Sequence, residues 1–195
     1  MRFLQDYDRK AAVMYAHRWA YGRNPAYYDY EKLGGDCTNF ASQCIFAGSG
    51  VMNFTPTFGW YYIDANQKAP AWTGVMYLWN FLTRKGVSVG PVGEPCQLED
   101  LCPGDIVQLS FKGEDFQHSP VVVSVGAVPT LENTLVAAHS YDADNRPLST
   151  YEFRDIRFLH ILGTVRPLQP ASREGAAKSP LQRERAFSFS FIFNL

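Results

Sequence analysis

The cysteine at position 37 stands at the start of a predicted helix, where a thiol can act as a nucleophile. Gly34 and Gly35 form a turn before it, Asp36 is a favourable N-cap residue, and apolar side chains recur at helical spacing after it. The first backbone N–H groups of a helix have no intrahelical partner and carry partial positive charge, which stabilises a thiolate. Such a setting lowers a thiol pKa from about 8.5 to roughly 3.5–7.5. We therefore expect Cys37 to be presented as a thiolate, although the cysteine alone fits a small core residue equally well.

A nucleophilic cysteine needs a base that takes its proton, and the four histidines are the candidates. His118 follows the polar loop 112–117 and opens a predicted strand, a position that leaves its ring accessible. His139 ends the next predicted strand, so an antiparallel pairing brings the two rings side by side. His17 lies in a helix and His160 lies between apolar strand residues. We expect the last two to be structural.

Predicted helices precede predicted strands along the chain. Apolar periodicity of 3.6 predicts helices over residues 7–21, 37–47 and 73–85. Alternating or continuous β-branched runs predict strands over 105–111, 118–125, 135–140 and 158–165. This order is typical of an α+β domain with an antiparallel sheet.

Composition limits the classes of function. With 195 residues, of which 46% are hydrophobic, the chain is long enough for one domain with its own core. The net charge of −1 offers no attraction for nucleic acid. The charged N-terminus lacks the apolar core of a signal peptide, and no run is long enough for a membrane span. We expect one domain over 1–166, followed by a flexible linker and hydrophobic tail over 167–195.

The four cysteines do not indicate a metal site. Their spacing lacks the CxxC or HxxxH pattern of a zinc site, so we expect no metal and no cofactor. Cys37 and Cys44 are too far apart on one helix to form a disulfide. Cys96 and Cys102 flank a short loop and pair only if that loop folds back, which the sequence leaves open.

Several separated motifs occur in the order of a known family. They are Gly-Asp-Cys-Thr-Asn-Phe-Ala-Ser-Gln at 35–43, Pro-Gly-Asp-Ile-Val at 103–107, His-Ser at 118–119, Ala-His-Ser at 138–140 and Asn-Arg-Pro-Leu at 145–148. Over residues 6 to about 166 the chain resembles the bacterial "putative amidase" domain family of the papain-like cysteine peptidase group, relatives of the NlpC-type cell-wall peptidases. The resemblance implies a papain-like α+β fold, in which N-terminal helices carry the nucleophile and pack on an antiparallel sheet or open barrel.

The resemblance also implies roles for single residues. Cys37 corresponds to the nucleophile, His118 to the general base and acid, and His139 to the polar residue that orients the imidazole. Asp142 and Asn145, which follow closely, are alternatives for that third role.

Oxyanion stabilisation departs from papain, because Glu31 stands where papain has its glutamine and its charge would repel an oxyanion. The backbone N–H of Cys37, with the Tyr30 hydroxyl, is the expected donor pair. The candidates for oxyanion or substrate contacts are Tyr30, Asp36, Trp60 and Trp72, the tryptophans because they lie in an aromatic segment that could wall a groove.

The implied function is a cysteine amidase or peptidase that hydrolyses amide bonds, with peptidoglycan stem peptides as the substrate class. The family role suggests the cell wall or extracellular space, while the sequence leaves localisation and oligomeric state open. The main alternative is a catalytically silent papain-like module that binds a peptide or glycan. An enzyme with an activated thiolate is expected to react with iodoacetamide at Cys37 faster than at its other cysteines.

Overall fold

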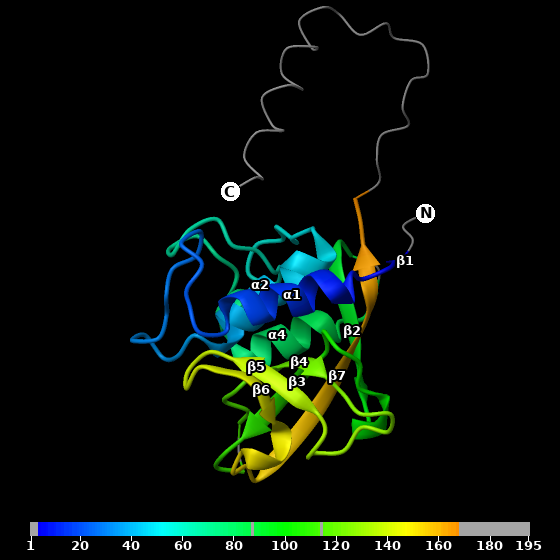
Figure 1. Ribbon diagram of the computed structural model, residues 1–195. Coiled ribbons are helices and arrows are strands. Elements are labelled where there is room, and N and C mark those ends of the chain that lie inside the picture. The colour runs from blue at the N-terminus through cyan, green and yellow to red at the C-terminus, as the bar shows by residue number, and fades with distance from the viewer. Residues whose placement is uncertain (1–3, 87, 114, 168–195) are drawn as a thin grey trace, which may run out of the picture.

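A layer of helices packs on one face of an antiparallel sheet in the computed structural model, which describes residues 4–86, 88–113 and 115–167 (Figure 1). The helices are α1 (Arg9–Trp19), α2 (Cys37–Ser49), α3 (Pro70–Thr73) and α4 (Val75–Leu82). The strands are β1 (Leu4–Gln5), β2 (Gly90–Cys96), β3 (Ile106–Ser110), β4 (Val121–Ser124), β5 (Leu135–Ala138), β6 (Ala143–Pro147) and β7 (Asp155–Val165). The expected α+β class is confirmed, whereas the papain-like arrangement stays a prediction.

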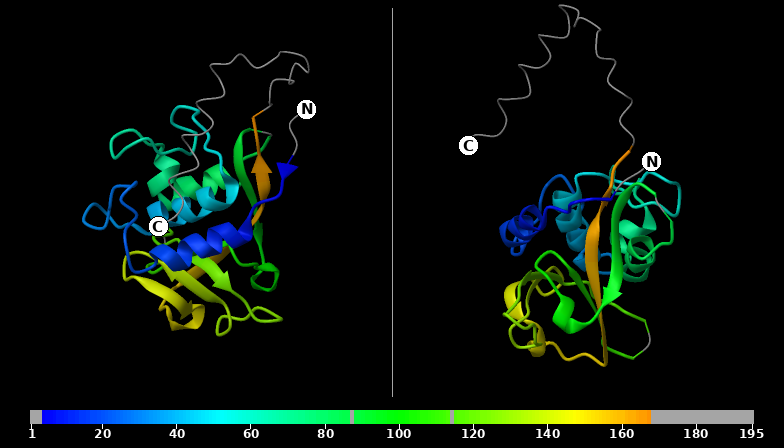
Figure 2. Two further views of the ribbon diagram at one scale, coloured as in Figure 1. Left: turned by 45° about the horizontal axis from the view of Figure 1, so that its top comes forward. Right: turned by 90° about the vertical axis from the view of Figure 1, so that its right-hand side faces the viewer.

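The sheet has the strand order β1-β7-β3-β4-β5-β6, and β2 pairs with β7 as well. Every pairing is antiparallel, and β7 runs along β2 and β3 as the longest strand of the sheet (Figure 2). Strands β4 and β5 are paired with Val121 opposite Ala137. This pairing brings the segments that contain His118 and His139 to the same end of the sheet.

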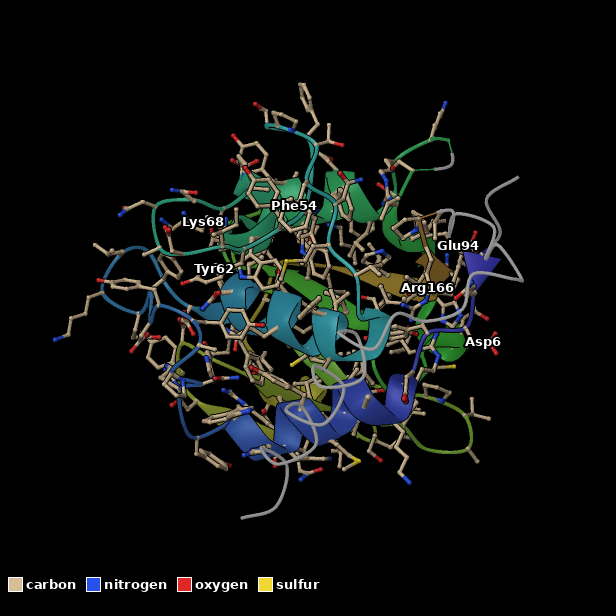
Figure 3. All side chains as sticks on the ribbon, turned by 90° about the horizontal axis from the view of Figure 1, so that it is seen from above. Asp6, Phe54, Tyr62, Lys68, Glu94 and Arg166 are labelled. Atoms are coloured by element: carbon tan, nitrogen blue, oxygen red, sulfur yellow. The ribbon has the colours of Figure 1, made fainter. Side chains whose placement is uncertain are left out.

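Helix α2 lies between α1 on one side and α3 and α4 on the other (Figure 3). All of its residues from Cys37 to Ile45 are buried, because neighbouring helices and the sheet cover it on several sides. Gly50 ends the helix with a φ of 66°, a conformation that glycine adopts without the strain of a Cβ atom. The nucleophile candidate therefore belongs to the most buried helix of the fold.

The turn before β3 is tied to both α1 and β7 through a buried carboxylate. Asp105 accepts hydrogen bonds from Arg9 at 2.7 Å, from Nδ1 of His160 at 2.8 Å and from the backbone of Ile161 at 2.9 Å. The carboxylate is fully buried, and a buried charge is stable only when paired and hydrogen-bonded in this way. His160 therefore has structural partners, in line with the sequence-based expectation.

Several elements differ from the sequence-based expectations. The helix predicted over 73–85 corresponds to the shorter α4, and an additional short helix, α3, precedes it and is separated from it by Gly74 in an extended conformation. Strands β1, β2 and β6 were not predicted at all. The linker and tail predicted over 167–195 lie almost entirely outside the described residues, so the predicted domain boundary stays a prediction.

Candidate active site

The thiol of Cys37 lies at the first turn of α2 and faces the segment that contains His118. Its Sγ is 3.7 Å from the hydroxyl oxygen of Thr38 and donates to the backbone carbonyl of Gln117 at 3.8 Å. The backbone N–H of Ser119 also interacts with this sulfur. The thiol thus contacts the backbone on both sides of His118, although 80 residues separate Cys37 from Gln117 in the sequence.

The expectation of a presented thiolate is wrong for this structure. Cys37 is only 7% exposed, and burial raises the pKa of its thiol. Hydrogen bonds from the Thr38 hydroxyl and from backbone N–H groups lower this pKa, but desolvation outweighs them, and the neighbouring Asp36 carboxylate raises it further. The helix start is present as predicted, yet the thiol is protonated at neutral pH because α2 is buried at that end.

His118 lines a cavity of about 600 Å³, the size range of ligand sites in proteins. Its ring lies 6.1 Å from the ring of Phe111 and 5.7 Å from that of Tyr151, measured between centroids. Burial, with a smaller effect from the charge of Arg146, lowers the pKa of His118 to about 4. At neutral pH the imidazole is therefore uncharged and can accept a proton.

No hydrogen bond joins the Cys37 thiol to the His118 ring among the described residues. The predicted contact between these two side chains therefore stays a prediction. What the structure brings together is the thiol and the backbone flanking His118.

His139 is bound to other groups than His118. Its Nδ1 lies 2.6 Å from the carboxylate of Asp36, its Nε2 lies 2.8 Å from the backbone carbonyl of Trp19, and its ring stacks on Phe40. Both ring nitrogens therefore have an oxygen partner, which fixes the orientation of the ring. His139 thus connects the start of α2 to the end of α1. Its hydrogen bonds go to Asp36 and Trp19, in place of the expected hydrogen bond to His118.

The two alternative third residues are also placed elsewhere. Asp142 accepts two hydrogen bonds from Arg23, at 2.9 and 3.0 Å. Asn145 is exposed in β6, with a φ of 53°. Neither residue lines the cavity with His118.

The candidates for oxyanion and substrate contacts need correction as well. The Tyr30 hydroxyl donates to the backbone carbonyl of Ala65 at 3.1 Å. Trp60 and Trp72 are fully buried, and their ring centroids lie 4.8 Å apart in the core. Asp36 is an N-cap whose carboxylate binds His139 instead of capping the helix. None of the four residues lines the cavity.

Glu31, which the sequence analysis compared with the papain glutamine, also has partners that account for its charge. Its carboxylate accepts a hydrogen bond from Ser140 at 3.0 Å and lies 3.6 Å from Arg23. The Ser140 hydroxyl in turn accepts the backbone N–H of Asp36 at 2.9 Å. Glu31 therefore braces the turn before α2.

The profile of a protein family described as "Putative amidase domain" matches residues 6–162. This chain belongs to that family. A protein of Bacillus subtilis (strain 168), called "Uncharacterized protein YhbB", is 33% identical over 145 residues, which make up 72% of this chain and 43% of that protein. The chain thus spans less than half the length of this relative. No solved structure matches the chain.

Membership of the amidase domain family indicates an amidase-like function, that is, hydrolysis of amides. The match covers every helix and most of the sheet, including Cys37, His118 and the cavity. In the described part of this amidase domain, no helix is long and apolar enough to cross a membrane.

Most residues that line the cavity of the amidase domain were missed as site candidates, among them three with polar or charged side chains. Arg146, Tyr151 and Glu152 line the cavity together with His118. Arg146 was noticed only as part of the Asn-Arg-Pro-Leu motif at 145–148. Its spacing from Cys37 gives no chemical signal, because strand β6, which carries it, reaches the cavity only through the fold.

One group of side chains in the amidase domain has the chemistry of metal ligands. Cys102, Asp105 and His160 bring ligand atoms within 4.8 Å of one another. The guanidinium of Arg9, however, binds Asp105 at 2.7 Å and lies 3.3 Å from His160 Nε2. A cation here would face this positive charge, so the group fits a structural hydrogen-bond network better than a metal site.

Proposed function

We propose that this chain hydrolyses an amide bond, with Cys37 as nucleophile and His118 as general base and acid. The observation that carries the proposal is that the Cys37 thiol, at the start of α2, contacts the backbone on both sides of a histidine whose ring lines the cavity. Family membership supports the same class of reaction. Contacts between a nucleophile and its base commonly tighten only when substrate binds.

The charge states at neutral pH determine how the reaction begins. The thiol is protonated and the imidazole is neutral, so His118 removes the proton as the sulfur attacks the amide carbonyl. The sulfur–carbon bond forms, and the oxyanion collapses as His118 gives its proton to the leaving amine. Water then attacks the thioester with His118 as base, which releases a carboxylic acid and restores the thiol.

Two donors are available for the oxyanion. The backbone N–H of Cys37 is in the first turn of α2, where N–H groups have no intrahelical partner. The hydroxyl of Tyr151 is buried in a residue that lines the same cavity as His118, and its neighbour there is the guanidinium of Arg146. Burial raises the pKa of Tyr151, so this hydroxyl keeps its proton. We assign to Tyr151 the role that the sequence suggested for Tyr30.

Replacing Tyr151 with phenylalanine is expected to lower kcat about 10²-fold with little change in KM, the scale for loss of one oxyanion donor. Tyr30→Phe is the matched control, because the Tyr30 hydroxyl donates to the backbone carbonyl of Ala65 and Tyr30 does not line the cavity. That variant is expected to keep its turnover within about threefold and to lose about 1 kcal/mol of stability. Steady-state kinetics of both variants test the assignment. A large loss of kcat in Tyr30→Phe with little loss in Tyr151→Phe would assign the oxyanion donor to Tyr30 instead.

The substrate class proposed is the peptide portion of peptidoglycan, as the family resemblance implies. The proposed function is tested by incubating the protein with purified muropeptides and analysing the products by mass spectrometry. Hydrolysis appears as two fragments whose masses sum to that of the substrate plus one water. Intact muropeptides and intact simple peptide amides after long incubation would contradict the proposal.

A binding module without catalysis is the second candidate, and the buried, protonated thiol of Cys37 favours it. In that case the protein binds muropeptides, Cys37→Ala leaves their affinity unchanged, and the wild-type protein releases no fragments. Calorimetric binding measurements beside the product analysis separate the two candidates.

A further inference from the structure

Arg146 places a guanidinium in the wall of the cavity that contains His118. Its Nε donates to the hydroxyl of Thr150 at 2.8 Å, and Nη2 donates to the Thr150 backbone carbonyl at 3.0 Å. The guanidinium carbon lies 3.8 Å from the centroid of the Tyr151 ring. Three contacts therefore fix the orientation of this side chain, so little conformational entropy is lost when it binds a further group.

The charge of Arg146 has no counterpart among the described residues. No carboxylate lies within 4.0 Å of its guanidinium there, although Glu152 lines the same cavity. Arg23, by contrast, forms a two-point ion pair with Asp142. The hydrogen bonds to Thr150 use Nε and Nη2 of Arg146, while Nη1 faces no acceptor other than the Tyr151 hydroxyl beside the guanidinium among the described residues. A cation held in a cavity with a free donor is suited to an anionic ligand group.

We propose that Arg146 binds a carboxylate of the substrate, and that the substrate is a short peptide with a free carboxylate near the amide bond that is cleaved. The proposal rests on the proposed function, because it takes the cavity beside His118 as the substrate site. A planar guanidinium recognises a carboxylate better than a lysine ammonium does, since its donors form a fork that matches the two oxygens.

The position of Arg146 also connects carboxylate binding to the base. Its positive charge is one of the causes that lower the pKa of His118. A bound carboxylate would offset that charge and make the imidazole a stronger proton acceptor in the complex. Binding of the substrate carboxylate would thus make His118 a stronger base in the complex than in the free protein.

The test measures binding separately from catalysis by using the Cys37→Ala protein and isothermal titration calorimetry. Two pairs of probes differ only in a carboxylate: acetyl-Ala-Ala as free acid and as amide, and acetyl-Ala-Glu amide beside acetyl-Ala-Gln amide. The first pair places the carboxylate at the chain end and the second in a side chain. At least one acid is expected to bind about tenfold or more tightly than its neutral partner.

Adding Arg146→Gln is expected to remove this preference, and Arg146→Lys to keep only part of it. Arg154→Gln is the matched control, because Arg154 is exposed and does not line the cavity. It is expected to keep the full preference. Melting temperatures of all variants show whether each remains folded, and Arg146→Lys keeps the test valid if Arg146→Gln does not fold.

Three results would overturn the proposal: equal affinity for the acid and neutral probes, no binding of either probe, or a preference for the acid that survives in Arg146→Gln. These outcomes are independent of whether the wild-type protein hydrolyses amides. A preference for carboxylates without turnover would support the Arg146 assignment and contradict the proposed function. Turnover without a preference for carboxylates would support the proposed function and contradict the Arg146 assignment.

Discussion

Replacing Cys37 with alanine is expected to lower kcat/KM for amide hydrolysis by about 10⁵-fold or more, the scale seen when a hydrolase loses its nucleophile. The substitution removes one sulfur atom from a buried site, so the fold is expected to lose only about 1 kcal/mol of stability. Product formation from muropeptides, with the melting temperature of each protein, measures both effects.

Cys44→Ala is the matched control for this variant. Cys44 lies seven residues further along α2 and is fully buried in the core, away from the cavity. This variant is expected to lose a similar or larger amount of stability and to keep its turnover. Equal activity in the wild-type and Cys37→Ala proteins would remove Cys37 from the mechanism.

Replacing His118 with asparagine is expected to lower kcat about 10²–10⁴-fold, the range for loss of a general base. In the wild-type protein the base is active when neutral, and its pKa is lowered to about 4 by burial and by Arg146. We therefore expect kcat/KM to fall on the acidic side near pH 4, well below the ordinary histidine range near 6.5. An acidic limb near pH 6.5, or none that depends on His118, would contradict this assignment.

The same lowered pKa has a consequence for stability. Between about pH 6.5 and 4 the unfolded chain binds a proton at His118 while the folded protein does not, so the free energy of unfolding decreases as the pH falls. Relative to His118→Asn, the wild-type protein is expected to lose about 3 kcal/mol over this window, an order-of-magnitude value. Chemical denaturation at pH 7 and pH 4 measures the difference.

The sequence predicted the elements with strong periodicity and missed those without it. The helix expected over 37–47 is α2, because its apolar spacing and the glycine after it are local signals. Strand β2, Gly90–Cys96, contains two glycines and two prolines, and it becomes a strand only through pairing with β7. Strand β6 is polar and lies at the edge of the sheet next to β5. Tertiary pairing decides such segments.

The candidate site was predicted less completely than the fold. Cys37 and His118 became candidates because helix starts and strand starts have recognisable patterns, and their catalytic roles stay predictions. The burial that protonates the Cys37 thiol comes from residues far along the chain, so the sequence could not show it. For the same reason fast reaction of Cys37 with iodoacetamide at pH 7 is no longer expected of the free protein. The sequence also did not show which aromatic residues line the cavity. Trp60 and Trp72 are core residues, whereas Tyr151 lines the cavity.

Trapping the acyl-enzyme tests the central claim most directly. The protein is mixed with an intact muropeptide that it hydrolyses, and the reaction is quenched with acid during turnover. The quenched protein is then digested and its peptides are analysed by mass spectrometry. We predict that the peptide containing Cys37 gains the mass of the acyl group, that hydroxylamine removes it, and that Cys44→Ala behaves in the same way. Turnover without an adduct on Cys37, or an adduct confined to Cys96 or Cys102, would contradict the account.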